Sequence, residues 1–466
     1  MSETLIFSEN NKLPPQKKKI FIGRWLLKNK KKKIQNYKVF NNNLSIKNKV
    51  KEYKYVKKIY SKVLRNLTPI LNNIHKKNYK ESDWEILLFY SLVYYISFAY
   101  NKWETIKKLK TKYNLEPVEL FSFQKNYFLK DDSQSFYTQM KSDEYDDWIT
   151  SKIIKAQNLK FYEKIVNKKR KKSKSFSNLK KLKLYKILFP NNYSKFFLIN
   201  LTLPKFLKVK LNLILNKKIR IYNRINFQTD DYISSKRKLF QAVKTNNKFE
   251  KFIYDTLYEI LPRNFLENFE FIETNIDYLN WPKKPKVIFT SYEHYFNDVF
   301  KIYVIIKRQE GAKLNILQHG HQGLNNVCFN YYEKKICNSY FNWGNSKDHK
   351  EKNLFCTTTI GKNIKKKIKK DILISYTEFS LKPWKFMSLP RVIDETEIYK
   401  DDLIELLSCL RKKPERKITL KYFAVDKNKY TTDEIKKKFK DLSFIRTDLK
   451  KRGFEFSNRY RLNIET

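Results

Sequence analysis

Glycine, cysteine and histidine are scarce in this sequence, which has seven, four and five of them among 466 residues. The cysteines form no CxxC pair and have no metal-ligand spacing with the histidines, so we expect reduced thiols and no metal site. The N-terminal residues lack the apolar segment of a secretory signal. The longest apolar run, 86–100, is shorter than the roughly 20 residues that span a bilayer, which favours a buried helix and a cytoplasmic protein.

Acidic residues are also few, with 47 against 99 lysines and arginines, and the formal net charge is +52. A charge of this sign normally indicates a polyanionic partner. Here the excess is mostly lysine and accompanies abundant Asn, Ile, Tyr and Phe, which is the pattern of an AT-rich coding bias. Nucleic acid is therefore not favoured as a partner, whereas smaller anions and an anionic membrane surface at the inner face of the membrane stay open.

Two long helices are expected in the first quarter of the chain. Apolar residues recur at helical spacing over 53–74, and a second helix begins near Ser82, which would be its N-cap, and ends near 109. Because the two helices should pack on each other, we expect burial of the apolar residues Trp84, Leu88, Leu92 and Trp103. His75 lies between the helices, where a structural hydrogen bond and a place in a substrate cleft are both open. Residues 115–250 are interpreted as mixed helices and loops.

A different pattern begins at residue 286. A short strand over 286–291, an amphipathic helix over 294–308, Gly311 and a strand over 314–317 make a βαβ unit, whose strands should be parallel. Further strands and one helix are expected, namely strands over 340–343, 354–358, 372–376 and 417–423 and a helix over 401–410. From Val287 onward this alternation predicts a doubly wound α/β fold.

The candidate site is the segment Gln318-His319-Gly320-His321-Gln322-Gly323, which follows the second of these strands. Ligands bind at the carboxyl ends of strands in open α/β sheets, glycines favour positive φ or close approach, and imidazoles titrate near neutrality. The backbone amides of such a turn can hold a phosphate. The glycine spacing is neither a dinucleotide fingerprint nor a P-loop. A tight turn with two incidental histidines is the alternative.

A family resemblance appears at these residues. The run 318–323, then Glu333 and the run 341–344, resembles a family of transferases from bacterial surface-polysaccharide (O-antigen-type) gene clusters, which is related to GT-B glycosyltransferases. Two earlier blocks are similar to the same family in the same order: 20–25, and 71–75 with 84–88 and Trp103. The His-Gly pair also resembles that of glycerophosphotransferases, in which a histidine is thought to activate the acceptor.

The resemblance implies an α/β fold with two Rossmann-like domains of GT-B type and an α-helical N-terminal elaboration. Residues 1–365 would be the N-terminal domain with helical insertions, on the acceptor side, and 366–466 the start of the donor domain. The last residues, 459–466, resemble a strand that leads in the family into a Thr-rich donor segment. We therefore expect an incomplete C-terminal domain.

The resemblance also implies the chemistry. It predicts transfer of a sugar or related group from a nucleotide-activated donor to a glycan or lipid-linked acceptor, without cofactor or metal. His319 would be a general base or a contact to the donor phosphate. Substrate or phosphate contacts would come from Ser291, Gln318, Gly320, His321 and Gly323, and Glu333 would lie either on a helix surface or in the cleft. A basic, non-catalytic protein that binds nucleic acid or anionic surfaces and an inactive truncated remnant are the alternatives.

Overall fold

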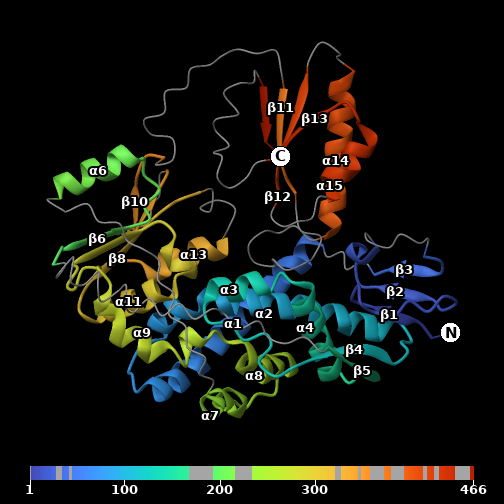
Figure 1. Ribbon diagram of the computed structural model, residues 1–466, viewed down its shortest axis with the longest axis horizontal. Coiled ribbons are helices and arrows are strands. Elements are labelled where there is room, and N and C mark those ends of the chain that lie inside the picture. The colour runs from blue at the N-terminus through green and yellow to red at the C-terminus, as the bar shows by residue number, and fades with distance from the viewer. Residues whose placement is uncertain are drawn as a thin grey trace. The chain divides into compact units, whose positions relative to one another are not determined.

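The chain forms two compact units in the computed structural model (Figure 1). The structure describes residues 2–27, 34–40, 45–166, 193–215, 233–320, 327–344, 348–356, 372–378, 393–412, 417–424, 430–446 and 462–465. The first unit takes in residues 2–19 and the described residues between 45 and 356. The second takes in the described residues between 20 and 40 and those from 372 onward.

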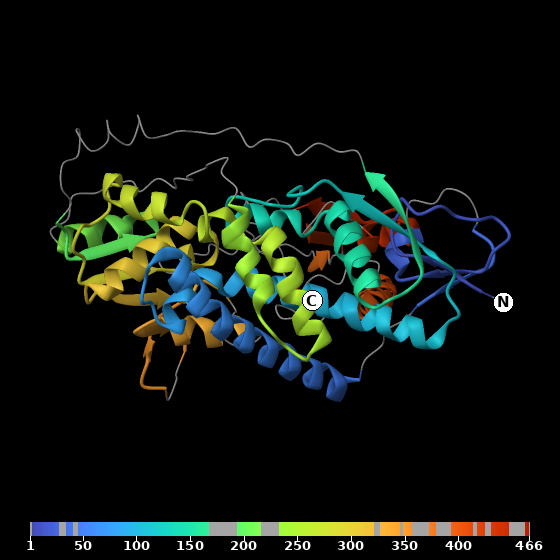
Figure 2. The ribbon, with the colours of Figure 1, turned by 90° about the horizontal axis from the view of Figure 1, so that it is seen from below.

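Two long helices, α1 (Ile46–His75) and α2 (Glu81–Lys112), pack side by side as expected (Figure 2). The hydroxyl of Ser45 caps α1 by accepting from Asn48 N. The prediction that Ser82 caps α2 is wrong, because the helix begins one residue earlier. At this end the Asp83 carboxylate accepts from Lys80 N at 3.1 Å, so an acid in the first turn replaces the expected hydroxyl.

α2 is buried on almost every side. Trp84, Leu88 and Leu92 are 0% exposed and Trp103 is 8% exposed, which confirms the expected burial. No residue from Asp83 to Ile106 is exposed, and exposed residues appear only from Lys107 onward. This long buried part contacts α1, α4 (Asp143–Ala156), α8 (Lys248–Ile260), α11 (Asp298–Gln309) and α13 (Val327–Ile336), so its apolar residues show no one-sided stripe. None of the helices in the described residues is both long enough and apolar enough to cross a membrane.

The larger sheet has five strands that are all parallel, in the order β10-β9-β8-β7-β6. The strands are β6 (Phe196–Ile199), β7 (Val287–Thr290), β8 (Lys313–Leu317), β9 (Ser339–Asn342) and β10 (Glu351–Asn353). The predicted βαβ unit is confirmed, because β7 and β8 pair in parallel. Its single predicted helix is two helices, α10 (Glu293–Phe296) and α11 (Asp298–Gln309), since Asn297 leaves helical geometry and caps α11.

Strands also occur in the segment that was predicted to hold only helices and loops. β4 (Val118–Phe123) and β5 (Phe161–Val166) form a parallel pair, and β6 belongs to the larger sheet. β5 is exposed along most of its length and mixes charged with apolar residues, so it lacks a buried-strand pattern. Within the described residues of this unit, the remaining α-helices are α3 (Ser133–Gln139), α6 (Lys205–Ile214), α7 (Ser234–Lys238), α8 (Lys248–Ile260), α9 (Phe269–Asn275) and α13 (Val327–Ile336).

The second unit is built on a smaller parallel sheet in the order β13-β12-β11-β14. Its elements are β11 (Ile372–Glu378), α14 (Ile393–Arg411), β12 (Ile418–Ala424), α15 (Tyr430–Lys438), β13 (Ser443–Arg446) and β14 (Leu462–Glu465). The strand order reverses at β11, as a doubly wound sheet requires. In the larger sheet the order of the described strands follows the chain from β6 to β10 without a reversal. The strand order of a doubly wound fold is therefore found only in the smaller sheet.

A third small sheet lies near the N-terminus, in the order β1-β2-β3. Its strands are β1 (Thr4–Ile6), β2 (Lys19–Phe21) and β3 (Tyr37–Val39). β2 ends at Phe21, within the block 20–25 that is similar to the family, and a 3-10 turn over Arg24–Leu27 follows it.

His75, the last residue of α1, has a structural role. Its Nε2 donates to the Phe265 carbonyl oxygen at 2.9 Å, and its ring packs on Phe269 at 4.4 Å and on Trp84 at 5.7 Å between centroids. Burial lowers the pKa of this imidazole to about 4, so the folded protein keeps it neutral. Of the two roles expected for His75, a structural hydrogen bond or a place in a substrate cleft, the structure therefore supports the hydrogen bond.

This depressed pKa predicts acid destabilisation. The unfolded chain binds a proton at His75 near pH 6.5, while the folded chain does not, so stability falls as the pH drops from about 6.5 towards 4, by up to about 3 kcal/mol. Urea unfolding at a series of pH values measures the effect. His75→Gln retains a side-chain donor but cannot titrate, so its stability should depend less on pH in this range; an unchanged dependence would contradict the assignment.

Candidate functional site

The carboxyl ends of the five parallel strands lie at one edge of the larger sheet. The segment after β6 contains Thr202, β7 leads into Ser291, β8 leads into Gln318, and β9 leads into Trp343. Polar groups from four neighbouring strands therefore meet at one edge, which we call the carboxyl edge. This is the edge at which open α/β sheets bind ligands.

Gln318 ties two strand ends together. Its Oε1 accepts from Trp343 N at 2.8 Å, and its Nε2 donates to the Gly320 carbonyl oxygen at 2.8 Å. Its backbone N also donates to the Phe341 carbonyl oxygen at 2.8 Å. The side chain predicted to contact substrate is thus engaged in shaping the turn that carries His319.

Gly320 lies in open space. An added Cβ would meet no atom of the described residues within 4 Å, and its backbone does not adopt positive φ, in contrast to Gly311 at φ +92°. Of the two expected reasons for glycine, positive φ or close approach, positive φ is therefore found at Gly311 and not at Gly320, where close approach stays a prediction. The fold leaves room beside the Gly320 backbone for another molecule. His321 and Gly323, which were predicted to share this site, lie outside the described residues.

Ser291 joins the ends of β6 and β7. Its side chain is fully buried, and its Oγ accepts from Thr202 N at 3.1 Å and lies 3.2 Å from Thr202 Oγ1. These contacts fix the connection after β6 to the connection after β7. The hydroxyl predicted to bind substrate is therefore already engaged with protein atoms.

Glu333, on α13, is fully buried at 1% exposure, which rules out a position on the helix surface. Its Oε1 accepts from Tyr295 OH at 2.6 Å and from His294 Nε2 at 3.0 Å. Burial alone would raise the pKa of this carboxyl, but the donors His294 and Tyr295 outweigh it and lower the pKa below the usual value. Glu333 is therefore ionised at neutral pH.

His319 lies next to this group. Its ring meets the Tyr295 ring edge to face, with 5.4 Å between centroids, and lies 6.0 Å from the Tyr292 ring. Nδ1 is shielded from solvent and has no hydrogen-bond partner in the described parts of the chain. Burial lowers the pKa of His319, while the charge of Glu333 acts in the opposite direction. The imidazole is thus mainly neutral at pH 7 and able to accept a proton.

His294 and Tyr295 are the site residues that sequence reasoning missed. Both are buried, and they connect the segment after β7 to Glu333 and, through the Tyr295 ring, to His319. The helical pattern over 294–308 had placed His294 in an ordinary amphipathic helix. The rule applied to the end of β8, that polar residues just past a parallel strand are site candidates, would have selected His294 at the end of β7.

The carboxyl end of β11 in the second unit is already occupied by a carboxylate. Glu378 is fully buried and accepts from Thr431 N at 2.6 Å and from Thr432 N at 3.0 Å. These amides begin α15, where an anion is favoured by the helix dipole. A bound phosphate would have to displace Glu378 from them.

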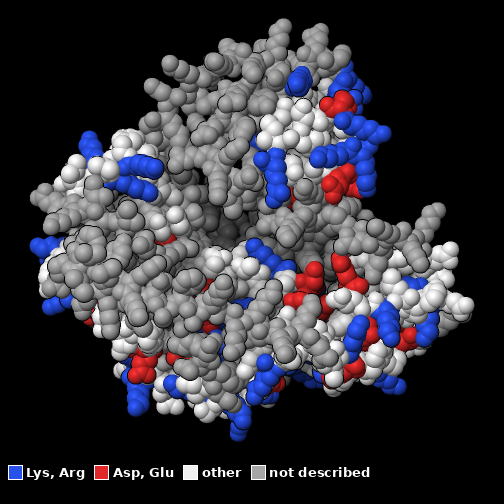
Figure 3. Space-filling model, in the orientation of Figure 1, with Lys and Arg blue, Asp and Glu red and all other residues white. Residues whose placement is uncertain are grey.

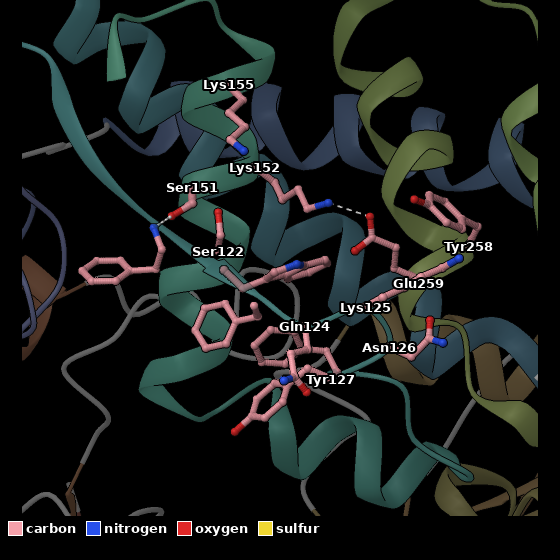
Figure 4. A pocket seen from close by; sticks show the side chains of 14 residues that line it. Ser122, Gln124, Lys125, Asn126, Tyr127, Ser151, Lys152, Lys155, Tyr258 and Glu259 are labelled. Carbon is pink, nitrogen blue, oxygen red and sulfur yellow. Dashed lines mark hydrogen bonds and ion pairs between the residues drawn. The ribbon is translucent and has the colours of Figure 1, made fainter. Parts of the chain in front are cut away.

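A separate cavity of about 250 Å³ lies past the end of β4 in the first unit (Figure 4). Aromatic side chains, among them Trp148, Tyr127 and Tyr258, form much of its lining. Lys152 pairs with Glu259 at 2.6 Å and Lys155 pairs with Glu163 at 2.5 Å. Because two of the three lysines that line it are paired with acids, this cavity is a weaker anion site than its composition suggests.

A neutral histidine and a buried, ionised glutamate thus lie at the carboxyl edge of a parallel sheet, the edge at which open α/β sheets bind ligands. The chain belongs to the LIC12162 family of transferases, whose family model matches residues 4–460. No curated protein and no solved structure matches it. The resemblance to a transferase family is therefore confirmed at the level of a transferase.

The two glycines should respond differently to alanine. Gly311→Ala places a side chain at positive φ and should cost about 1–2 kcal/mol of unfolding free energy. Gly320→Ala meets open space at ordinary φ and should stay within about 0.5 kcal/mol of the parent. Urea denaturation of both variants measures this. Equal destabilisation would show that Gly320 is required by the fold.

The charge of Glu333 should be detectable at His319. Because this charge raises the His319 pKa against the effect of burial, Glu333→Gln should lower that pKa further. Titration of the histidine ring resonances by NMR measures it, with His319→Gln identifying the signal. An unchanged or raised His319 pKa in Glu333→Gln would contradict the coupling.

Proposed function

We propose that this transferase moves a sugar or related group from a nucleotide-activated donor to a hydroxyl of a glycan or lipid-linked acceptor in surface-polysaccharide biosynthesis. The observation that carries the proposal is the neutral, partly buried His319 beside the ionised Glu333 at the carboxyl edge. The family supports group transfer, and the sequence resemblance supports the polysaccharide setting and the GT-B type. The two parallel α/β units are compatible with a GT-B architecture of two Rossmann-like domains.

In the proposed reaction, the His319 imidazole accepts the proton of the acceptor hydroxyl. The acceptor oxygen then bonds to the transferred carbon, the bond from that carbon to the donor phosphate oxygen breaks, and the nucleotide leaves with both electrons. Glu333 stabilises the imidazolium that forms, since an opposite charge nearby favours the protonated state. His294 and Tyr295 are positioning residues, because they hold Glu333 through hydrogen bonds.

The donor phosphates would lie beside Gly320. The space around this residue admits close approach of a ligand to the backbone, and backbone amides stabilise a departing diphosphate without reorganisation. Gln318 supports this role indirectly, because its two hydrogen bonds hold the turn in place. We do not assign direct substrate contacts to Gln318 or Ser291, since their side chains are engaged within the protein.

The distribution of charge favours transfer over a purely basic binding protein. On the face drawn in Figure 3, lysine and arginine side chains of the described residues are interspersed with acidic and uncharged ones and form no continuous basic surface. Several of the described lysines pair with acids, for example Lys335 with Glu85 at 2.6 Å and Lys77 with Glu273 at 2.7 Å. Part of the positive charge of the described residues is thus locally compensated.

Replacing the proposed base should separate catalysis from binding. His319→Gln should lower the rate of nucleoside diphosphate release by about 10²–10⁴-fold, as for loss of a general base. The assay uses a panel of UDP-, GDP- and dTDP-sugars with glycan acceptors. Thermal stabilisation by the active donor should persist in this variant. His75→Gln is the matched control, because it replaces a structural histidine and should retain turnover.

The pH profile and Gly320→Ala complete the test. Because the His319 pKa is lowered, kcat/KM should stay high through pH 6.5 and decline only at more acidic pH. Gly320→Ala should weaken stabilisation by the donor without weakening the fold. Parental turnover in His319→Gln would refute the assignment of the base, and the absence of stabilisation by any nucleotide sugar would refute the donor class.

A further inference from the structure

α6 (Lys205–Ile214) presents an apolar face to solvent. No residue of this helix is buried. The exposed fractions are 57% for Phe206, 42% for Val209, 64% for Leu213 and 67% for Ile214. The first three recur at i, i+3 and i+7, which places them on one face of a helix, and Ile214 extends that face. In a globular protein such a stripe normally faces the core, so its exposure indicates a partner surface.

Lysines accompany this stripe. The helix contains Lys205, Lys208 and Lys210 and no acidic residue. Lys205 and Lys210 are exposed, and neither pairs with an acid within the described ranges. The neighbouring sequence 167–192 also contains many lysines and no acidic residue. In the space-filling view, blue side chains lie beside white ones over α6 (Figure 3).

The chain attaches α6 to the carboxyl edge. β6 ends at Ile199, and α6 begins at Lys205, so only a short connection separates them. Within this connection Thr202 hydrogen-bonds Ser291, whose segment adjoins His319. The start of α6 is therefore fixed to the same edge of the sheet as the proposed site.

We propose that α6 docks this protein on an anionic lipid bilayer, lying in the interface with its apolar stripe in the headgroup–acyl boundary and its lysines on anionic headgroups. A helix with an apolar stripe and lysines beside it binds such surfaces by burying apolar area and by electrostatic attraction to the anionic headgroups. Nucleic acid would leave the apolar stripe unpaired. A second copy would bring lysines against lysines, and like charges repel.

Vesicle cosedimentation of the full chain tests the proposal. The protein should bind phosphatidylcholine vesicles that contain phosphatidylglycerol more tightly than pure phosphatidylcholine vesicles, and high salt should weaken this binding. The triple variant Phe206→Gln, Val209→Gln, Leu213→Gln should bind these vesicles at least about tenfold more weakly, because each substitution removes apolar area from the contact with the bilayer. Lys205→Gln with Lys210→Gln should remove the preference for anionic lipid.

A matched control is available on β5, where Tyr162 is 50% exposed and Ile165 is 73% exposed. Tyr162→Gln with Ile165→Gln should leave vesicle binding unchanged. His319→Gln should also bind vesicles normally, so failure of the proposed transfer chemistry and failure of docking are distinguishable. Parental vesicle binding by the α6 triple variant would overturn the proposal. So would competition by duplex DNA with loss of lipid binding, or a dimer in solution that the triple variant dissociates without any vesicle binding.

Discussion

The all-round burial of α2 is the constraint on which the rest of the first unit depends. From Asp83 to Ile106 this helix has no exposed residue, because α1, α4, α8, α11 and α13 pack around it. Partners also reach its backbone, since Lys301 Nζ donates to the Leu87 carbonyl oxygen at 3.2 Å and Tyr332 OH donates to the Ile86 carbonyl oxygen at 3.1 Å. These bonds tie α11 and α13 to the same turn of α2.

This enclosure also explains how a charged carboxylate survives inside the protein. Tyr332 precedes Glu333 on α13, and the Tyr90 ring of α2 packs on Tyr295 at 4.5 Å between centroids. α2 therefore contacts both α13, which carries Glu333, and the segment that carries its hydrogen-bond donors His294 and Tyr295. An ionised group in a low-dielectric interior is tolerated only when its donors are held in place, and here the helix core holds them. The packing around α2 therefore also holds the hydrogen-bond donors that keep Glu333 ionised.

The sequence predicted long regular patterns better than short or mixed ones. The periodicity of α1 and α2 and the β7–β8 unit were accessible because apolar spacing there is unambiguous. β5 was not, since it is exposed along most of its length and mixes charged with apolar residues. β6 was missed as well, although it is as long as β7. His319 was found through the strand-end rule, whereas His294 was absorbed into a helical pattern. Burial of Glu333 and the occupied hydroxyl of Ser291 depend on tertiary contacts that no local pattern records.

The open surroundings of Gly320 bear on how this position varies among relatives. Folding makes no demand for glycine there, because its φ is ordinary and a Cβ would touch nothing. Gly311, by contrast, is required by its backbone. Selection for stability alone would let other residues accumulate at 320 and not at 311. A glycine retained at 320 across a set of relatives would therefore record selection by a ligand, and a drift away from glycine would mark lineages that had lost it.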